Sequence, residues 1–364
     1  MEYRILPRGG EKISVIGLGG GYIGEGGEKE MREALELAVG RGVNYFDLAM
    51  SEASPFAVYG ETLKDRRKEL YYQVHFGAEY RTGKYGWTLS LERIKKSVDW
   101  QLKNLKTDYI DFGFVHCIDE EADLRKVLEG GTLDYMKQLK EAGVMRHIGL
   151  SSHTPGIVNR MLDTGLIDMV MFSINPAYDY RHGDYAIGTV DERTALYRRC
   201  EAEGVGISVM KAFGDGQLLN AGTSPFGQAL SEYQCIQYAL DKPGVLTVLP
   251  GLRGTEDLRR LLGFFEAAEE EKDYSVLGSF APREAEGVCV YCNHCQPCPF
   301  GLDVGLINKY YDLAMAGDAL ARNHYLNLEK KASSCTGCGH CDRRCPFQVK
   351  QTERMKEIRD YFGV

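Results

Sequence analysis

The chain has 364 residues, of which 44% are hydrophobic and 26% are charged, and its formal net charge at pH 7 is −8. This length accommodates one large domain and one small domain. The acidic balance, without a long basic run, argues against nucleic acid as a partner. No apolar run approaches the roughly 20 residues that span a bilayer. No secretory signal is recognisable at the start, which predicts a cytoplasmic protein with no membrane partner.

Short apolar runs alternate with longer amphipathic stretches over residues 1–268. Residues 1–16 favour a hairpin with its turn at Pro7–Gly10. Beyond it, eight β-then-α units predict a parallel sheet closed into a (β/α)8 TIM barrel, a fold of the α/β class. The predicted strands are Val15–Leu18, Asn44–Leu48, Leu70–Phe76, Tyr109–Val115, Met145–Leu150, Met169–Ile174, Gly206–Met210 and Val245–Leu249.

Residues 269–286 are charged at their start and predict a linker. Residues 287–364 predict a separate C-terminal domain that is mainly helical and ferredoxin-like. Its helices are predicted at Val304–Ala316, Arg322–Lys331 and Thr352–Phe362.

The predicted C-terminal domain contains eight of the eleven cysteines in two matched sets. Each set is a C-x2-C-x2-C run followed, after two or three residues, by Cys-Pro. In two-cluster ferredoxins, three thiolates of such a run bind one [4Fe–4S] cluster and the fourth reaches the other cluster. The pattern therefore predicts two [4Fe–4S] clusters. One is assigned to Cys289, Cys292, Cys295 and Cys345, and the other to Cys335, Cys338, Cys341 and Cys298.

Structural zinc and disulfides are the alternatives for these cysteines. Zinc sites commonly use two separated pairs of ligands, which a triplet plus Cys-Pro does not match. Disulfides require an oxidising compartment. Because ferredoxin-type clusters are usually sensitive to oxygen, an anaerobic or low-oxygen cell fits best. Cys117, Cys200 and Cys235 lie outside the sets and are interpreted as small apolar residues.

The chain resembles the aldo/keto reductase superfamily, in the branch that carries a C-terminal ferredoxin-like domain. The resemblance covers almost the whole chain. It rests on the stretches Tyr3–Gly19, Gly42–Asp47, Thr107–His116, Arg146–Ser152, Met210–Gly214 and Pro250–Gly251.

Typical members of this family transfer a hydride between NAD(P)H and a carbonyl, using Asp, Tyr, Lys and His at the strand ends. The resemblance places Asp47 at the Asp position and His116 at the His position. The family spacing from Asp47 to Gly60 places Glu52 where the Tyr would be, and strand three places His75 where the Lys would be. The expected catalytic group is therefore Asp47, Glu52, His75 and His116.

The positions that contact the nucleotide in this family are also altered. Ser151 matches a residue that contacts the nicotinamide amide, but Ser152 replaces the usual Asn. The family's Gln and stacking aromatic both fall on Met, at positions 171 and 210. The resemblance assigns candidate cofactor contacts to Ser151, Ser152, Lys211, Gly251 and Arg253, and it leaves NAD(P)H binding open.

Polar residues at the C-terminal ends of barrel strands are candidates for an active site. Two carboxylates and two imidazoles there could act as acid and base, bind Fe(II), Mn or Zn, or only bind a ligand or one another. The leading hypothesis is an oxidoreductase of a small organic substrate, with electrons passed through the clusters. An NAD(P)H-dependent reductase with a non-standard tetrad and a non-catalytic electron carrier are the alternatives, and a redox-protein partner is left open.

Overall fold

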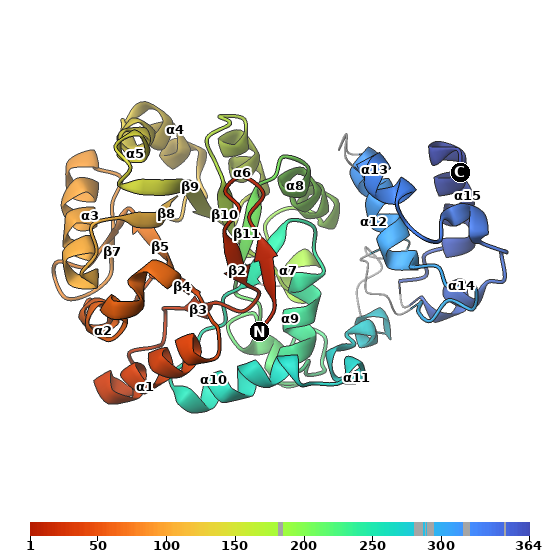
Figure 1. Cartoon of the computed structure of the whole chain (residues 1–364), viewed down its shortest axis with the longest axis horizontal. Coiled ribbons are helices and arrows are strands. Elements are labelled where there is room, and N and C mark those ends of the chain that lie inside the picture. Colours follow the sequence, from red (N-terminus) through yellow and green to blue (C-terminus); the bar gives the residue numbers. More distant parts are fainter. Residues whose placement is uncertain (181–184, 280–286, 288, 290–294, 316–320, 346) are drawn as a thin grey trace. The chain divides into compact units, whose positions relative to one another are not determined.

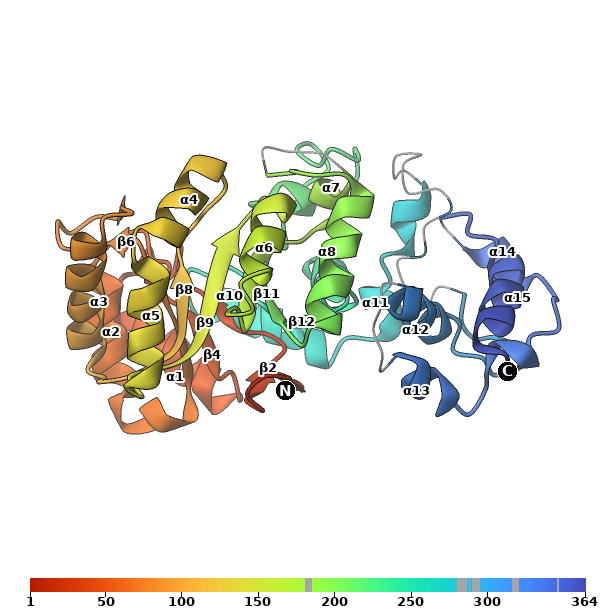
Figure 2. The same cartoon turned by 90° about the horizontal axis from the view of Figure 1, so that it is seen from above.

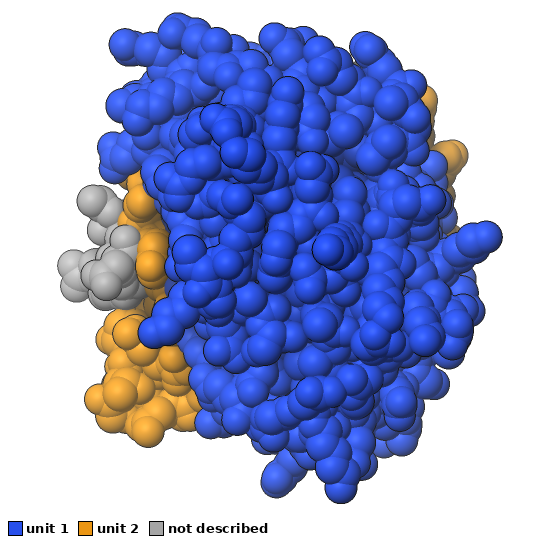
Figure 3. Space-filling model, turned by 90° about the vertical axis from the view of Figure 1, so that its left-hand side faces the viewer, with its two compact units in different colours: residues 1–174, 204–212, 246–267 blue, residues 175–203, 213–245, 268–364 orange. Residues whose placement is uncertain are grey.

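The computed structural model describes residues 1–180, 185–279, 287, 289, 295–315, 321–345 and 347–364. Residues 280–286 of the predicted linker, and Cys292 of the first cysteine set, lie outside the described residues. The chain divides into two compact units, coloured separately in Figure 3. Unit 1 comprises residues 1–174, 204–212 and 246–267, and unit 2 comprises the rest. The predicted domain boundaries at 268 and 286 remain predictions.

Eight strands form one sheet whose order is β12-β11-β10-β9-β8-β5-β4-β3. The six neighbouring pairs from β3 to β11 are parallel. Parallel bridges from Ile16 to Val248 and from Gly19 to Gly251 join the two edges of the sheet. The predicted barrel is thus confirmed. Its strands are β3 (Leu18–Gly19), β4 (Tyr45–Asp47), β5 (Tyr71–Phe76), β8 (Ile110–Val115), β9 (Met145–Ser152), β10 (Met169–Ser173), β11 (Gly206–Met210) and β12 (Val245–Val248).

All eight predicted strands are present, with ends that differ by up to three residues. The predicted N-terminal hairpin is also present, as β1 (Tyr3–Ile5) paired antiparallel with β2 (Lys12–Ser14). The third and last sheet of the described residues, β6 (Ala78–Glu79) with β7 (Gly86–Trp87), was not predicted. Its two-residue strands are too short to give an alternating pattern.

Helices of unit 1 lie along the outer side of its strands (Figures 1 and 2). The helices are α1 (Gly27–Gly40), α2 (Ser54–Leu63), α3 (Leu91–Leu105), α4 (Glu121–Glu129), α5 (Thr132–Glu141), α6 (Pro155–Leu162) and α10 (Thr255–Leu262). Where neighbouring helices such as α2 and α3 pack together, a small residue lets the backbones approach. Gly60 is an example, because a Cβ there would lie 2.1 Å from the carbonyl oxygen of Asn104.

Alternation along the strands decides which side chains enter the barrel. On β5, the odd-numbered residues point inward, since Gln73 reaches Ser208 of β11. The even-numbered Tyr72 packs instead against Phe46 and against Tyr59 of α2. Inward residues of the barrel strands and residues of the N-terminal hairpin form an apolar core of Leu6, Ile13, Tyr45, Phe112, Phe114, Met169, Met171, Leu246 and Leu249.

Unit 2 contains a second hydrophobic core built by helices of the cysteine-rich region. Leu302, Ile307 and Met355 are buried there, and the rings of Tyr325 and Phe362 stack with centroids 3.9 Å apart. The helices of this unit are α7 (Pro176–Asp179), α8 (Val190–Ala202), α9 (Glu232–Leu240), α11 (Glu269–Lys272), α12 (Val304–Met315), α13 (Ala321–Leu326), α14 (His340–Arg344) and α15 (Gln351–Phe362). The predicted helices of the C-terminal region match α12, α13 and α15.

Ion pairs connect α8 with the helices of the cysteine-rich region inside unit 2. Asp312 of α12 binds Arg198 of α8 at 2.9 Å and also accepts from Arg354 of α15. Lys309 binds Glu201 at 2.8 Å. Among the described residues, no helix combines the length and apolar composition that crossing a membrane requires.

Candidate active site

Asp47 ends β4 on the inward side of the barrel and is buried. Its Oδ1 accepts a hydrogen bond from Nε2 of Gln73 at 2.9 Å. The Gln73 oxygen accepts from the hydroxyls of Tyr45 (2.7 Å) and Ser208 (3.1 Å). Gln73 therefore uses both ends of its amide and holds the Asp47 carboxylate in one orientation.

His75 and His116 continue this polar group toward the C-terminal ends of the strands. His75 Nε2 lies 2.6 Å from the same Asp47 Oδ1, and His75 Nδ1 lies 2.8 Å from Nδ1 of His116. Both rings are buried. His75 sits two positions beyond Gln73 on β5, and His116 two positions beyond Phe114 at the end of β8, so strand alternation turns all of these side chains inward.

His116 is a neutral imidazole near pH 7. Burial lowers its pKa well below the ordinary value, and the neighbouring His75 adds to the effect. The cation is disfavoured because it would lose its hydration without gaining a carboxylate partner of its own.

Tyr85 is the outermost member of the group. Its hydroxyl lies 2.9 Å from Nε2 of His116, and the side chain is 43% exposed. The loop that carries it begins at Gly77 (φ 118°) and is held by β6 and β7. Tyr85 N donates to the Ser51 carbonyl at 3.2 Å, and the indole N–H of Trp87 donates to the His116 carbonyl at 3.0 Å.

Hydrogen bonds link three of the four predicted catalytic residues one after another, from Asp47 to His75 and from His75 to His116. Glu52 is exposed, accepts from the hydroxyl of Ser54 at 2.7 Å, and makes no hydrogen bond to the other three. Its catalytic role stays a prediction. Tyr59, seven residues beyond Glu52, is buried against Phe46 and Tyr72 and packs in the wall of the barrel.

Ser151 and Ser152 use their hydroxyls to hold neighbouring loops. Ser151 Oγ accepts from the backbone N–H of Cys117 at 2.7 Å, and Ser152 Oγ donates to Oδ1 of Asp119 at 3.0 Å. Both serines are buried. The predicted contact of these residues with a nicotinamide stays a prediction.

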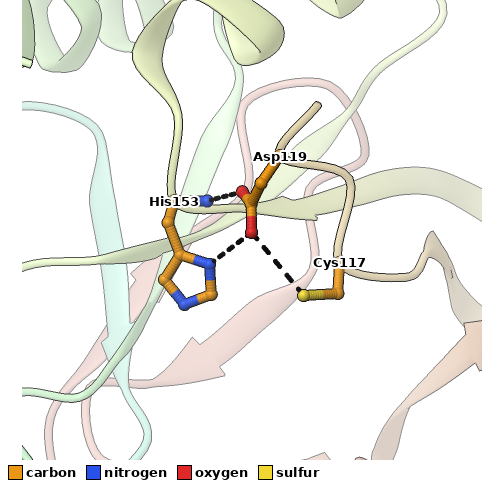
Figure 4. Close-up of side chains that lie close together, drawn as sticks. All are labelled: Cys117, Asp119 and His153. Carbon is orange, nitrogen blue, oxygen red and sulfur yellow. Dashed lines mark hydrogen bonds and ion pairs between the residues drawn. The ribbon is translucent and has the colours of Figure 1, made fainter. Parts of the chain in front are cut away.

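Cys117, Asp119 and His153 form a second cluster, where β8 and β9 end (Figure 4). His153 Nδ1 lies 2.9 Å from Oδ2 of Asp119, and the Cys117 thiol donates to the same oxygen at 3.7 Å. One potential metal-ligand atom of each residue lies within 4.8 Å of the other two, so the three side chains are close enough to bind one metal ion.

The pKa values of Cys117 and Asp119 in this cluster are shifted in opposite directions. Burial raises the pKa of Cys117 to about 11, and the Asp119 carboxylate adds to this, so the thiol stays protonated at neutral pH. Burial alone would raise the pKa of Asp119, but hydrogen bonds from His153 lower it overall. Asp119 thus binds both Cys117 and His153 and ties two loops together.

The remaining candidate cofactor residues lie at the ends of β11 and β12. Lys211 follows β11 with φ 58°. Gly251 pairs with Gly19, and a Cβ there would lie 2.8 Å from the ring of Tyr22. Arg253 is exposed and donates from its backbone N–H to Asp257 at 3.1 Å. The predicted phosphate contact of Arg253 stays a prediction.

In the cysteine-rich region, one small cavity is lined by Cys335, Cys338, Cys341 and Cys298. Three of these belong to the second set and the fourth to the first set, which is the crossed grouping that the sequence predicts. The tight loop between Cys335 and Cys341 requires Gly337 and Gly339, which adopt φ values of 72° and 69°. Four thiols around one cavity fit the ligand set of a [4Fe–4S] cluster.

The first cysteine set is described in part. Cys289 accepts from Nε2 of Gln351 at 3.7 Å, and Cys345 accepts from the backbone N–H of Val349 at 3.4 Å. Both thiols therefore lie beside the segment that begins α15. Cys295 is buried in the same region's hydrophobic core.

Sequence reasoning missed Tyr85, Gln73 and Asp119. Gln73 has the inward parity of β5, so strand alternation could have identified it. Asp119 follows the β8 strand by four residues, as polar residues at barrel mouths do. Tyr85 had no usable signal, because its position depends on the path of a loop rather than on a strand.

Comparison with family models matches residues 15–233 to the aldo/keto reductase family and residues 287–349 to a 4Fe-4S dicluster domain. Among curated proteins, the chain is 30% identical over 186 residues to L-galactose dehydrogenase of Arabidopsis thaliana, covering 47% of this chain. It is 28% identical over 181 residues to an uncharacterised oxidoreductase of Bacillus subtilis, covering 48% of this chain. The chain spans 56% of the length of each of these relatives.

Among solved structures, an aldo-keto reductase from Bacillus halodurans in its holo form aligns with a TM-score of 0.61 at 21% identity. The alignment covers 78% of this chain and 97% of that one. At this identity, the likeness concerns the fold alone.

Proposed function

The chain belongs to the aldo/keto reductase family and carries a 4Fe-4S dicluster domain, and from this premise we propose that it is an iron–sulfur oxidoreductase of a small organic substrate. The substrate is a carbonyl or hydroxyl compound bound where the barrel strands end. Electrons pass to or from it through two [4Fe–4S] clusters. The name of the Arabidopsis relative, a dehydrogenase of a sugar, favours a hydroxyl compound.

The grouping of Cys298 with Cys335, Cys338 and Cys341 carries the proposal. It supports two clusters with exchanged fourth ligands, as in ferredoxins that transfer electrons. Cys289, Cys292, Cys295 and Cys345 would bind the second cluster. When bound, the clusters supply one-electron oxidation and reduction, which the side chains of the barrel cannot supply.

The barrel residues handle protons and orientation. His116 is neutral and faces both His75 and Tyr85, so it can accept or release a proton near pH 7. The Asp47 carboxylate accepts from His75, and Gln73 fixes the orientation of this carboxylate. The family's usual Tyr and Lys positions hold Glu52 and His75 in this sequence.

Anaerobic titration of the iron-loaded protein with NADPH and NADH tests the proposal. We expect weak binding and slow reduction of the clusters by either nucleotide, and substrate-dependent bleaching of the cluster absorbance. Tight stoichiometric NAD(P)H binding with carbonyl reduction that is independent of the clusters would instead establish an ordinary reductase with an unusual tetrad.

A His75→Gln variant separates an enzyme from an electron carrier. A carrier would keep its electron transfer to an artificial acceptor and would show no substrate-dependent reaction in either form. An enzyme loses turnover of the substrate, whereas electron exchange between its clusters and the acceptor continues unchanged.

A further inference from the structure

We propose that Tyr85 exchanges the substrate's proton and that His116 and His75 relay it to Asp47. The inference rests on the proposed function, because it takes the substrate to lie where the barrel strands end. It assigns the outermost position of the proton chain to a tyrosine of the β6–β7 loop rather than to Glu52.

The four residues form an unbroken series from the barrel interior to the surface. The successive distances are 2.6 Å from Asp47 to His75, 2.8 Å from His75 to His116, and 2.9 Å from His116 to Tyr85. Exposure of the residues is 3%, 0% and 8% for the three inner members and 43% for Tyr85. Only the last member can therefore meet both the chain and a substrate.

The direction of the hydrogen bonds follows from the inner end. Because an ionised carboxylate only accepts, the proton between Asp47 and His75 lies on Nε2 of His75. In the proposed chain, Nδ1 of His75 is the acceptor of the contact with His116, so Nδ1 of His116 donates. Nε2 of neutral His116 accepts in turn, and the Tyr85 hydroxyl donates to it.

This arrangement can take up one proton. When a substrate hydroxyl gives its proton to the Tyr85 oxygen, the phenol proton moves to Nε2 of His116. The Nδ1 proton of His116 moves to Nδ1 of His75, and the Nε2 proton of His75 is then shared with Asp47. The substrate becomes an alkoxide and the Asp47–His75 pair gains one proton. In the direction of carbonyl reduction, protonation of the alkoxide to the alcohol runs through the same shifts in reverse.

The environment of Tyr85 favours such a coupled transfer. Burial raises the pKa of Tyr85 to about 12, so a free phenolate is unfavourable near neutral pH. A phenol that passes its proton to His116 while receiving another never carries a full charge. The loop contacts of Tyr85 N with Ser51 and of Trp87 with His116 hold the ring in place.

Glu52 lacks these contacts. It is exposed, and its described partners are the Ser54 hydroxyl and a backbone bridge to Lys84. Among the described residues, no series of hydrogen bonds leads from Glu52 to Asp47.

The tautomers of the two histidines test the chain without knowledge of the substrate. Multiple-bond ¹H–¹⁵N correlation on [¹⁵N]histidine-labelled holoprotein, with oxidised clusters, resolves the protonated nitrogen of each ring. Signals are assigned with His75→Gln and His116→Gln. We expect His75 to be protonated at Nε2 and His116 at Nδ1. A His116 protonated at Nε2 would overturn the proposal.

The Tyr85→Phe variant should shift the Nε2 resonance of His116, because that nitrogen loses its donor. Tyr3→Phe is the matched control. It removes an exposed phenol whose hydroxyl donates to the Gly42 carbonyl at 2.9 Å and which contacts none of the four proton-transfer residues. The control should leave the His116 resonances unchanged. An unchanged Nε2 resonance in Tyr85→Phe would contradict the contact itself.

Turnover gives the functional readout. A panel of primary and secondary alcohols is tested with ferricyanide as one-electron acceptor. For any alcohol that the wild type oxidises, Tyr85→Phe should lower kcat roughly 10²- to 10⁴-fold, with KM changed little, as loss of a proton-transfer group does. Tyr3→Phe should match the wild type.

A kcat within about threefold of the wild type in Tyr85→Phe, or the large loss in Glu52→Gln instead, would overturn the assignment. If the wild type oxidises none of the alcohols, the proposed function fails on these substrates. The tautomer measurement then still decides whether the proton chain exists.

Discussion

The polar chain of the barrel and the cysteine sets bring their residues together by different means. Asp47 and His75 are 28 residues apart and His75 and His116 are 41 apart, and three separate strands position them. Cys335, Cys338 and Cys341 lie within seven residues, and one tight loop positions them. Only Cys298, from the other set, has to be brought in from a distance.

This difference determines how each site tolerates change. The barrel fixes the direction of the side chain at position 75 through strand alternation, whichever residue type stands there. A cluster needs four sulfur ligands, and replacing any of them removes part of the site. The catalytic residues at the ends of the barrel strands can therefore vary between related proteins, whereas the cysteine pattern cannot vary without loss of a cluster.

The largest effect is expected from Cys298→Ala, which should empty the cluster site of the second cysteine set and leave about four of about eight iron atoms per chain. Crossed ligation makes a sharper prediction. Cys298→Ala combined with Cys335→Ala should lose no more iron than Cys298→Ala alone, whereas Cys298→Ala with Cys289→Ala should lose nearly all of it.

Iron and sulfide analysis measures both pairs. Cys117→Ala is the control, because this cysteine lies outside the sets and should keep full iron content. The opposite result for the two double variants would assign all four cysteines of each set to a single cluster.

An intermediate effect is expected from Asp312→Ala. Asp312 is 8% exposed and is shared by Arg198 of α8 and Arg354 of α15, so its removal takes a carboxylate contact from two cations at once. We expect a loss of about 1–3 kcal/mol of unfolding free energy, between the values for exposed and buried pairs. Denaturant unfolding followed by cluster absorbance measures it.

The matched control for this variant is Asp360→Ala, whose pair with Arg359 is on the surface and 68% exposed at the carboxylate. It should change the unfolding free energy by less than about 0.5 kcal/mol. Equal effects of the two variants would show that Asp312 does not connect α8 to the cysteine-rich region.

The smallest effect concerns pH and compares two histidines of the barrel. The pKa of His116 is lowered by burial, so the unfolded chain binds more protons below about pH 6.5, and stability falls as the pH falls. The pKa of His147 is raised, because the hydrogen bonds that its ring donates to Asp168 and Glu11 outweigh its burial. Its contribution is present below about pH 6.5 and is lost as the pH rises through the raised pKa.

His116→Gln should therefore reduce the acid sensitivity of unfolding, whereas His147→Gln should cost more stability at pH 6 than at pH 9. We expect differences on the order of 1 kcal/mol, read from unfolding curves at the two pH values. The same pH trend in both variants would contradict the opposite environments of the two rings.

Sequence patterns predicted the barrel well, because apolar strands of a parallel sheet form continuous runs that turns interrupt. The family resemblance placed Asp47, His75 and His116 in one site, and the structure brings these three residues into hydrogen-bonded contact. Sequence patterns could not place Glu52 or Tyr85. Both belong to loops, where the path depends on contacts such as Ser51 with Tyr85 rather than on a repeating pattern. The shared cavity of Cys298 and the second set followed from motif spacing alone.

Gln73 has a consequence for engineering the protein. Its amide is fixed by Tyr45 and Ser208 from other strands, and it fixes Asp47 in turn. The inner end of the proton chain thus belongs to the barrel wall and is independent of the loops above it. Loops that select a substrate could be exchanged for those of another barrel, and Asp47, His75 and Gln73 would stay in place. The new loop would again have to supply a hydroxyl to His116.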